Sequence, residues 1–143
     1  MMVLCKDRQY RNYLDAEFEF WHSHIEALHL EEGRDVLIFG CGMWGKALVK
    51  ELNKHKNVSI KGFCDNNLEL QGQCLENYPI YSAEESVDKY PNAFYIVAID
   101  KYADIIEKQL IGLSVNEERV RIFETYNSGK SIRKYFEERL NDN

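Results

Sequence analysis

D-V-L-I-F-G-C-G-M-W-G-K-A-L-V-K-E-L, the stretch from Asp35 to Leu52, decides the fold of this chain. It opens with the apolar run Val36 to Phe39, which has the length and composition of a buried strand. Gly40, Gly42 and Gly45 follow at the spacing G-x-G-x-x-G, and the apolar residues after them recur at helical spacing. The stretch therefore predicts a strand, a glycine loop and a helix in direct succession.

Each glycine of this loop has a separate physical role. Gly40 permits a tight turn off the strand, Gly42 lets an anionic group approach the backbone, and Gly45 lets the helix pack closely on the strand. The free N–H groups and the positive end of the helix dipole then face an anion. Together these features predict a nucleotide-binding βαβ unit, and the alternative is a purely structural tight turn.

Two polar positions follow predicted strands elsewhere in the chain. Asp65 stands twenty residues after Gly45, at the end of the strand-like run 58–64, where a carboxylate would bind a ribose. Asp100 ends a second apolar run, residues 94–99. An ordinary turn is the alternative for the Asp-Asn-Asn cluster that Asp65 begins. The predicted ligand-binding residues are Gly40, Cys41, Gly42, Met43, Trp44, Gly45, Asp65, Asn66 and Asp100.

Strand-like and helical patterns alternate along the chain. We expect strands at residues 36–39, 58–64, 78–81, 94–99 and 119–123, and helices near 7–30, 43–55, 82–89, 102–113 and 128–140. Residues 68–78 are expected to form a loop over the ligand cleft, and Ser82 with Glu85 matches a capping box. This alternation predicts a three-layer, doubly wound α/β fold, with a parallel sheet of about five strands in the order 3-2-1-4-5 and an extra N-terminal helix.

The predicted N-terminal helix carries an aromatic stripe. Its members recur at steps of four or three, and they are Tyr10, Leu14, Phe18, Trp21, Ile25 and Leu28, widened by Tyr13 and Phe20. Such a stripe packs on the domain's own sheet or forms a partner interface, and a homodimer or a partner enzyme is expected to use it. The predicted organisation is this amphipathic helix over residues 1–33 and a nucleotide-binding domain over residues 34–143.

Composition narrows the expected partners. A net charge of −6 and a pI near 5.3 argue against a nucleic-acid surface, which would need clustered Lys and Arg. No run of eighteen apolar residues and no charged-then-apolar leader is present, so the sequence predicts a soluble, cytoplasmic protein with no membrane partner.

The four cysteines predict neither a metal site nor a disulfide framework. They form no C-x-x-C pair and no ligand-like spacing with histidine, so they are expected to be free thiols. His22 and His24 point to different faces of a helix and are expected to be solvated. Cys41, at a helix N-terminus, would have a lowered pKa and be redox-sensitive, or it is simply a small residue tolerated beside the backbone.

No catalytic residue can be assigned from the sequence. Tyr126 and Lys130 stand at the spacing Tyr-x-x-x-Lys, but they straddle Ser128-Gly129, a helix start rather than a helix interior. A methyltransferase would carry an acid where Ile38 stands, and a P-loop would need Gly-Lys-Ser/Thr four residues after another glycine, a spacing that this sequence lacks. A binding module remains, or one half of a site completed by another chain, and whether the chain is an enzyme stays open.

Four motifs follow one another between about Asp35 and Phe123. In chain order they are V-L-I-F-G-C-G-M-W-G-K-A-L, I-K-G-F-C-D-N-N, G-Q-C-L-E-N-Y-P-I-Y-S and F-Y-I-V-A-I-D-K-Y. This pattern resembles the NAD(P)-binding-like Rossmann domains of bacterial polysaccharide and nucleotide-sugar biosynthesis, such as the N-terminal domains of sugar-nucleotide dehydratases and sugar acyltransferases. The chain departs from them by lacking a partner catalytic domain and by carrying the N-terminal helix.

The resemblance implies that the glycine loop meets the phosphates of a small-molecule nucleotide and that Asp65 meets its ribose or lies beside it. The expected ligand is NAD or NADP, with a UDP-sugar as the alternative. Asp65 would repel a 2′-phosphate unless Lys46 or Lys61 compensates. The chain is then expected to be a stand-alone nucleotide-binding domain, a ligand sensor that acts through its N-terminal helix, or a subunit of a nucleotide-sugar epimerase or dehydratase.

Overall fold

A computed structural model describes the backbone of residues 2–99 and 101–123, and the side chains of residues 11–99 and 101–123. The helices are α1 (Met2–Glu26), α2 (Met43–His55), α3 (Ala83–Lys89), α4 (Ala103–Gly112) and the short 3₁₀ helix η1 (Glu117–Arg119). The strands are β1 (Asp35–Phe39), β2 (Ser59–Cys64), β3 (Cys74–Leu75), β4 (Tyr78–Tyr81), β5 (Phe94–Val97) and β6 (Val120–Ile122).

The strands form one sheet in the order β3-β4-β2-β1-β5-β6. Five of them run parallel to their neighbours, in the order β4-β2-β1-β5-β6, and this confirms the predicted order 3-2-1-4-5. The chain passes from β1 to β2 on one side of β1, and after β4 it returns to β5 on the other side. The strand order therefore reverses beside β1. Ligands of open α/β sheets bind at such a switch point, outside the carboxyl ends of the strands.

Residues 68–78 are not wholly the loop that the sequence predicts. β3 pairs antiparallel with β4, with Leu75 opposite Tyr78. Glu76 and Asn77 connect them with φ angles of 50° and 68°, so both central residues of this two-residue hairpin turn are left-handed. The turn was missed because it lacks the glycine that marks most turns of this kind, and because each strand of the hairpin is short.

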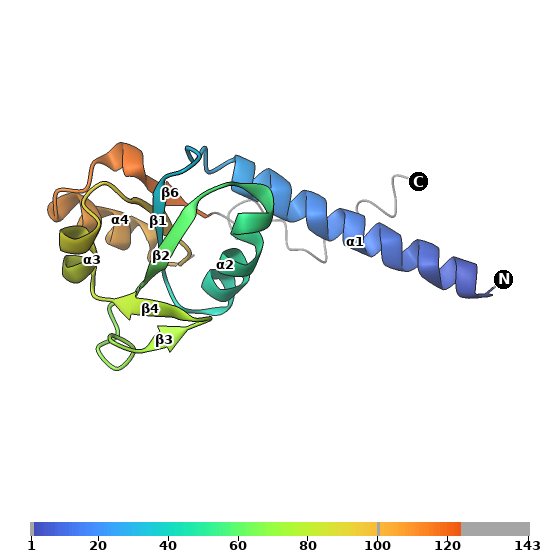
Figure 1. The fold of residues 1–143 in the computed structure, drawn as a ribbon, viewed down its shortest axis with the longest axis horizontal. Helices are drawn as coiled ribbons and strands as arrows, with labels where there is room; N and C mark the ends of the chain where they lie inside the picture. The colour runs from blue at the N-terminus through green and yellow to red at the C-terminus, as the bar shows by residue number, and fades with distance from the viewer. Residues whose placement is uncertain (1, 100, 124–143) are drawn as a thin grey trace.

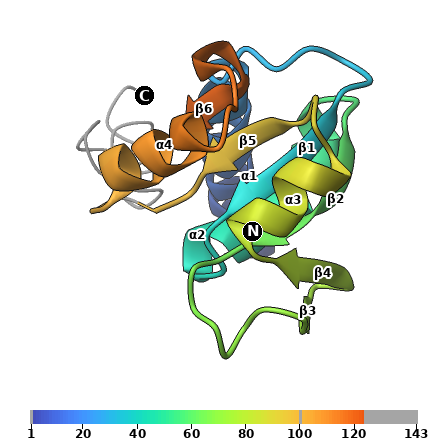
Figure 2. The same ribbon diagram turned by 90° about the vertical axis from the view of Figure 1, so that its left-hand side faces the viewer.

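The helices cover the two faces of the sheet in pairs (Figures 1 and 2). α1 and α2 lie over one face, and α3 and α4 lie over the other. Alternate residues of β1 supply the two cores: Val36 and Ile38 face α1 and α2, whereas Leu37 and Phe39 belong to the cluster with α3 and α4. A strand buried on both faces explains the continuous apolar run of the sequence.

The capping box predicted at the start of α3 is confirmed. The Ser82 side chain accepts a hydrogen bond from the backbone N–H of Glu85 at 3.1 Å, and the Glu85 carboxylate accepts one from the Ser82 backbone at 3.4 Å. These two bonds satisfy N–H groups that the first turn of a helix leaves without partners.

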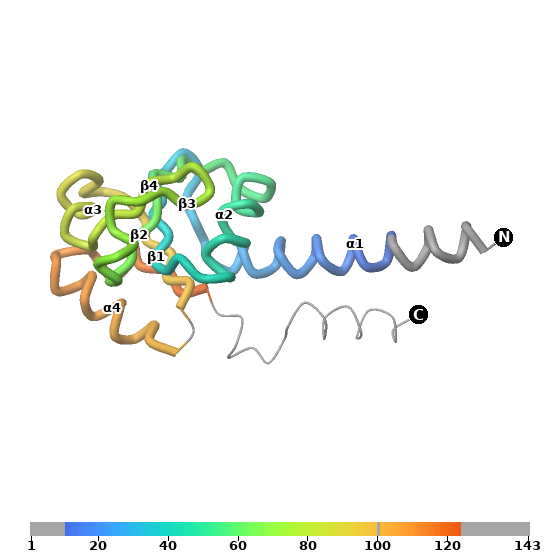
Figure 3. Tube along the Cα trace, turned by 90° about the horizontal axis from the view of Figure 1, so that it is seen from below, coloured from blue at the N-terminus to red at the C-terminus, as the bar shows by residue number. Residues whose placement is uncertain are grey.

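The stripe on α1 is only partly buried. Phe20, Trp21 and Ile25 belong to the core, but Leu14 and Phe18 are exposed. Of the two roles expected for the stripe, packing on the domain holds for the buried residues and not for Leu14 and Phe18, because α1 extends past the sheet (Figure 3). Periodicity identifies the apolar side of a helix and not how far the covering surface reaches.

Three predictions fall outside the described residues. They are the ligand position Asp100, the helix at 128–140 and the pair Tyr126 and Lys130. Of the helices in the described ranges, none combines the length and the apolar character needed to cross a lipid bilayer.

Candidate functional site

The three loop glycines differ in what surrounds them. A Cβ at Gly40 would lie 2.8 Å from Cγ1 of Ile99, and the backbone there has φ 117°. A Cβ at Gly45 would collide with the backbone oxygen of Gly40. A Cβ at Gly42 would have no atom within 4 Å. The fold therefore requires glycine at the first and third positions but gives no packing reason for glycine at the second.

The first turn of α2 presents an uncompensated positive dipole end. Gly42 is the N-cap residue and has no side chain to accept from the helix N–H groups, and the first turn carries no acidic residue. Met43 is 75% exposed, so the turn is open to solvent. This arrangement can accept an anionic group such as a phosphate.

Asp65 joins the glycine loop to the end of β2. Its Oδ2 accepts a hydrogen bond from the backbone N–H of Cys41 at 3.3 Å, and its Oδ1 accepts one from the backbone N–H of Asn67 at 2.9 Å. A carboxylate has about four acceptor positions, so both bonds leave capacity for a ribose hydroxyl. The structure thus brings the predicted loop and the predicted carboxylate into direct contact.

The Cys41 thiol is not activated. Burial, followed by the charge of Asp65 and a hydrogen bond to it, raises the pKa of Cys41 to about 12. The alternative of a lowered pKa at the helix N-terminus is therefore wrong, because removal from solvent and a neighbouring carboxylate outweigh the helix dipole. Cys41 fits its other interpretation, a small residue beside the backbone.

Asn66 is held by a residue that no motif of the sequence marks. Its amide and that of Gln109 on α4 exchange two hydrogen bonds, each of 2.9 Å. This pair ties the turn after β2 to a helix on the opposite side of the switch point. The two residues are 43 positions apart, and a glutamine in an amphipathic helix gives no local signal of such a contact.

Trp44 lies in the loop sequence but directs its ring into the protein. Its ring centroid is 6.0 Å from that of Trp21 and 6.1 Å from that of Phe123. The side chain therefore belongs to an aromatic cluster beneath α1, and only the backbone of Trp44 is placed to meet a ligand at the helix N-terminus.

A groove of about 530 Å³ adjoins the glycine loop on the α1 side. Its lining combines loop residues with side chains of α1 and α2, and comprises Glu17, Trp21, Cys41, Gly42, Met43, Lys46, Ala47, Lys50 and Glu51. Lys50 lies 3.6 Å from Glu76 in an ion pair, whereas Lys46 lines the groove one turn into the helix. The N-terminal helix thus forms one wall beside the candidate phosphate site.

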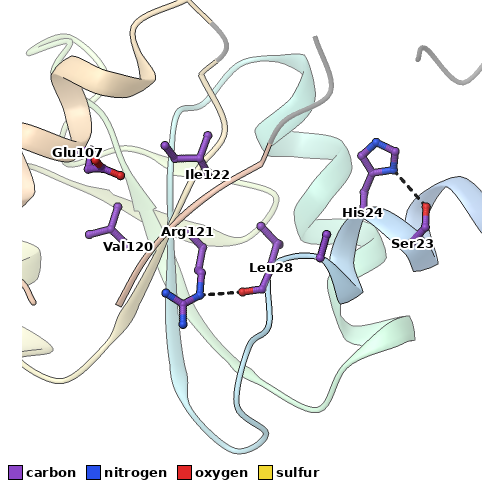
Figure 4. A pocket seen from close by; sticks show the side chains of 8 residues that line it. Ser23, His24, Leu28, Glu107, Val120, Arg121 and Ile122 are labelled. Carbon is purple, nitrogen blue, oxygen red and sulfur yellow. Dashed lines mark hydrogen bonds between the residues drawn. The ribbon is translucent and has the colours of Figure 1, made fainter. Parts of the chain in front are cut away.

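A second cavity, of about 540 Å³, lies between α1 and β6 and contains no loop residue (Figure 4). Arg121 lines this cavity, and its Nε donates a hydrogen bond to the Leu28 backbone oxygen at 2.8 Å. The guanidinium also lies over the Phe94 ring at 5.3 Å. Since Arg121 is engaged in joining β6 to the end of α1, we place the candidate site at the glycine loop.

In the described ranges, no group of three His, Cys, Asp or Glu residues is arranged to hold a metal.

The topology and the loop define a Rossmann-like α/β domain. The chain belongs to the family described as C2185-like, N-terminal, whose model matches residues 32–121. No curated protein matches the chain.

The fold is shared with solved structures of low sequence identity. A UDP-D-quinovosamine 4-dehydrogenase from Vibrio fischeri has a TM-score of 0.58 and 22% identity over 70% of this chain and 88% of its own. RSP, a Rex-family repressor, has a TM-score of 0.57 and 17% identity over 82% of this chain and 63% of its own. RSP in complex with beta-NAD+ and operator DNA has a TM-score of 0.55 and 18% identity over 82% of this chain and 61% of its own. This chain therefore spans less than two thirds of RSP.

The exclusion of nucleic acid as a partner class is wrong. RSP has this fold and was solved with operator DNA. Net charge is a property of the whole chain, whereas contact with phosphates depends on the local arrangement of Lys and Arg. An acidic average therefore does not exclude that class of partner.

Proposed function

We propose that this chain is a nucleotide-binding domain that takes NAD or NADP at the glycine loop. The observation that carries the proposal is the open space at Gly42. Its φ of −79° suits any residue, and a Cβ placed there would have no atom within 4 Å, so neither strain nor packing explains the glycine. Close approach of a pyrophosphate to the backbone does explain it.

The neighbouring groups support the same ligand. The uncapped first turn of α2 would receive the pyrophosphate, and Asp65 would accept from the adenosine ribose. Asn66, held by Gln109, would border the site, and Asp100 is proposed as a further ligand position. The cofactor, when bound, would supply hydride chemistry or serve as the signal of a sensor, and the residues of this chain would bind and orient it.

NAD is favoured over NADP by the charges near Asp65. A 2′-phosphate would lie beside this carboxylate, which repels it. Lys61 does not compensate, because its Nζ lies 3.8 Å from Oδ1 of Asp35 at the start of β1. Lys46 lines the groove next to Gly42 and is the remaining candidate for a compensating charge.

A UDP-sugar is the alternative ligand, and sugar-nucleotide metabolism is the proposed context. Support comes from the motif resemblance and from the fold shared with a UDP-D-quinovosamine 4-dehydrogenase. A sensor role is the second candidate function, since Glu17 and Trp21 of α1 line the same groove as the glycine loop. Turnover of a UDP-sugar with NAD would favour an enzyme, and binding without turnover would favour a sensor.

The test is a thermal-shift titration with NAD, NADH, NADP, UDP-glucose and UDP-N-acetylglucosamine. A ligand at a hundred times its dissociation constant adds about 2.7 kcal/mol to the unfolding free energy, a shift of several degrees. Gly42→Val should fold normally and lose the shift, because its side chain enters the space reserved for phosphate.

Gly112→Val is the matched control, since Gly112 is exposed and no atom lies within 4 Å of its Cβ position. It should keep the full ligand shift. Asp65→Ala should weaken NAD more than NADP. If no nucleotide shifts the wild-type protein, or if Gly42→Val retains the shift, the glycine loop is architectural and the proposal fails.

A further inference from the structure

The apolar stripe of α1 continues beyond the part that the domain buries. Trp21 and Ile25 lie in the core, 2% and 0% exposed. The stripe runs on through Phe18 and Leu14, which are 56% and 42% exposed. Figures 1 and 3 show this part of α1 extending past the sheet and the other helices. We call Leu14 and Phe18 the α1 ridge. Exposed apolar side chains on a protruding helix are typical of an interaction surface.

The ridge is continuous with packing inside the domain. Phe18 already lies 4.7 Å from the ring of His55 at the end of α2 and stacks at 5.8 Å on His22. These contacts hold the ridge on one side and leave its outer side open. A partner would therefore meet a surface fixed in position, which lowers the entropy that docking must overcome.

The charges beside the ridge indicate how the helix of a partner would run relative to α1. Arg11 and Asp15 are exposed and lie one helical turn apart, on the same flank of α1. Two antiparallel copies of α1, related by a two-fold axis level with residue 13, bring Arg11 of each copy beside Asp15 of the other. Parallel copies would instead place like charges together. The order of charges thus makes this helix self-complementary only in the antiparallel arrangement.

We propose that a second copy of this chain docks on the α1 ridge, with the two α1 helices antiparallel. The contact is isologous: Leu14 of each copy lies beside the two-fold axis, and each copy offers the same pair of charges. Apolar burial supplies affinity, and the two Arg–Asp pairs select the orientation. This inference rests on α1 alone and does not depend on nucleotide binding at the glycine loop.

The first test is the mass of the full chain by analytical ultracentrifugation over a wide concentration range. A reversible dimer is expected. Leu14→Asp should raise the dissociation constant by roughly a hundredfold, since it places a carboxylate at the centre of the contact in both copies. Leu68→Asp is the control, because Leu68 is 81% exposed on the loop after β2, and it should leave the dimer unchanged.

Charge reversal tests the orientation with the full chain. Arg11→Asp and Asp15→Arg should each weaken the dimer, by about tenfold, and the double variant should restore it, because the exchange recreates both opposite-charge pairs. Restoration is not expected for parallel helices, in which like charges meet before and after the exchange. A chain that is monomeric at every concentration, or a dimer unaffected by Leu14→Asp, overturns the proposal and assigns the ridge to another occupant, such as residues 124–143 or a different protein.

Discussion

At the scale of single residues, Cys41 shows how a neighbour determines reactivity. Because burial and Asp65 raise its pKa to about 12, almost no thiolate forms near neutral pH. We predict that iodoacetamide at pH 8 modifies the exposed Cys74 while sparing Cys41 in the folded protein. Peptide mapping by mass spectrometry measures both sites in one sample.

Cys64 serves as the internal control, since burial raises its pKa to about 12 as well. Unfolding in urea should make all of these thiols react. Labelling of native Cys41 at the rate of Cys74 would contradict the raised pKa that partial burial and Asp65 give its thiol.

At the scale of elements, α3 depends on its capping box. The helix has only seven residues, so the hydrogen bonds at its start are a large share of what stabilises it. We predict that Ser82→Ala lowers the unfolding free energy by about 1 kcal/mol, because the Glu85 N–H loses its acceptor. Urea denaturation measures the change.

Ser82→Thr is the matched variant, since it keeps a hydroxyl oxygen at the N-cap. Its unfolding free energy should stay close to that of the wild type. An equal loss in both variants would mean that packing at this position, and not the cap, is responsible.

The junction of α1 with α2 makes the stability of the whole molecule depend on pH. The side chain of His55 is 1% exposed, and its Nδ1 has no hydrogen-bond partner in the described part of the chain. Burial lowers the pKa of His55 below its ordinary value of 6.5, with further lowering by His22 and Lys54 and an opposing effect of Glu51.

Since the unfolded chain takes up this proton first, the unfolding free energy should fall as the pH falls through 6.5, and level off below the folded pKa. Urea denaturation between pH 7.5 and pH 5 measures it. His55→Gln should remove this part of the pH dependence. His29→Asn, at an exposed position with positive φ that asparagine tolerates, should retain it. A His55→Gln profile that parallels the wild type would refute the assignment.

The sequence alone determined the five parallel strands and their order in the sheet, but not the short strand β3. A strand buried on both faces needs a continuous apolar run, and a tight strand-to-helix turn needs glycine, so both leave local marks at Val36 to Gly45. The capping box at Ser82 could also be predicted from the sequence, since its two hydrogen bonds join residues three positions apart.

Only the tertiary structure decided which contacts form between distant segments. It placed Asp65 against Cys41, paired Asn66 with Gln109, and separated the buried half of α1 from its exposed ridge. Local patterns record backbone geometry and the side of an element that is apolar. Hydrogen bonds and burial across the fold depend on where the elements meet in space, and no periodicity within one segment carries that information.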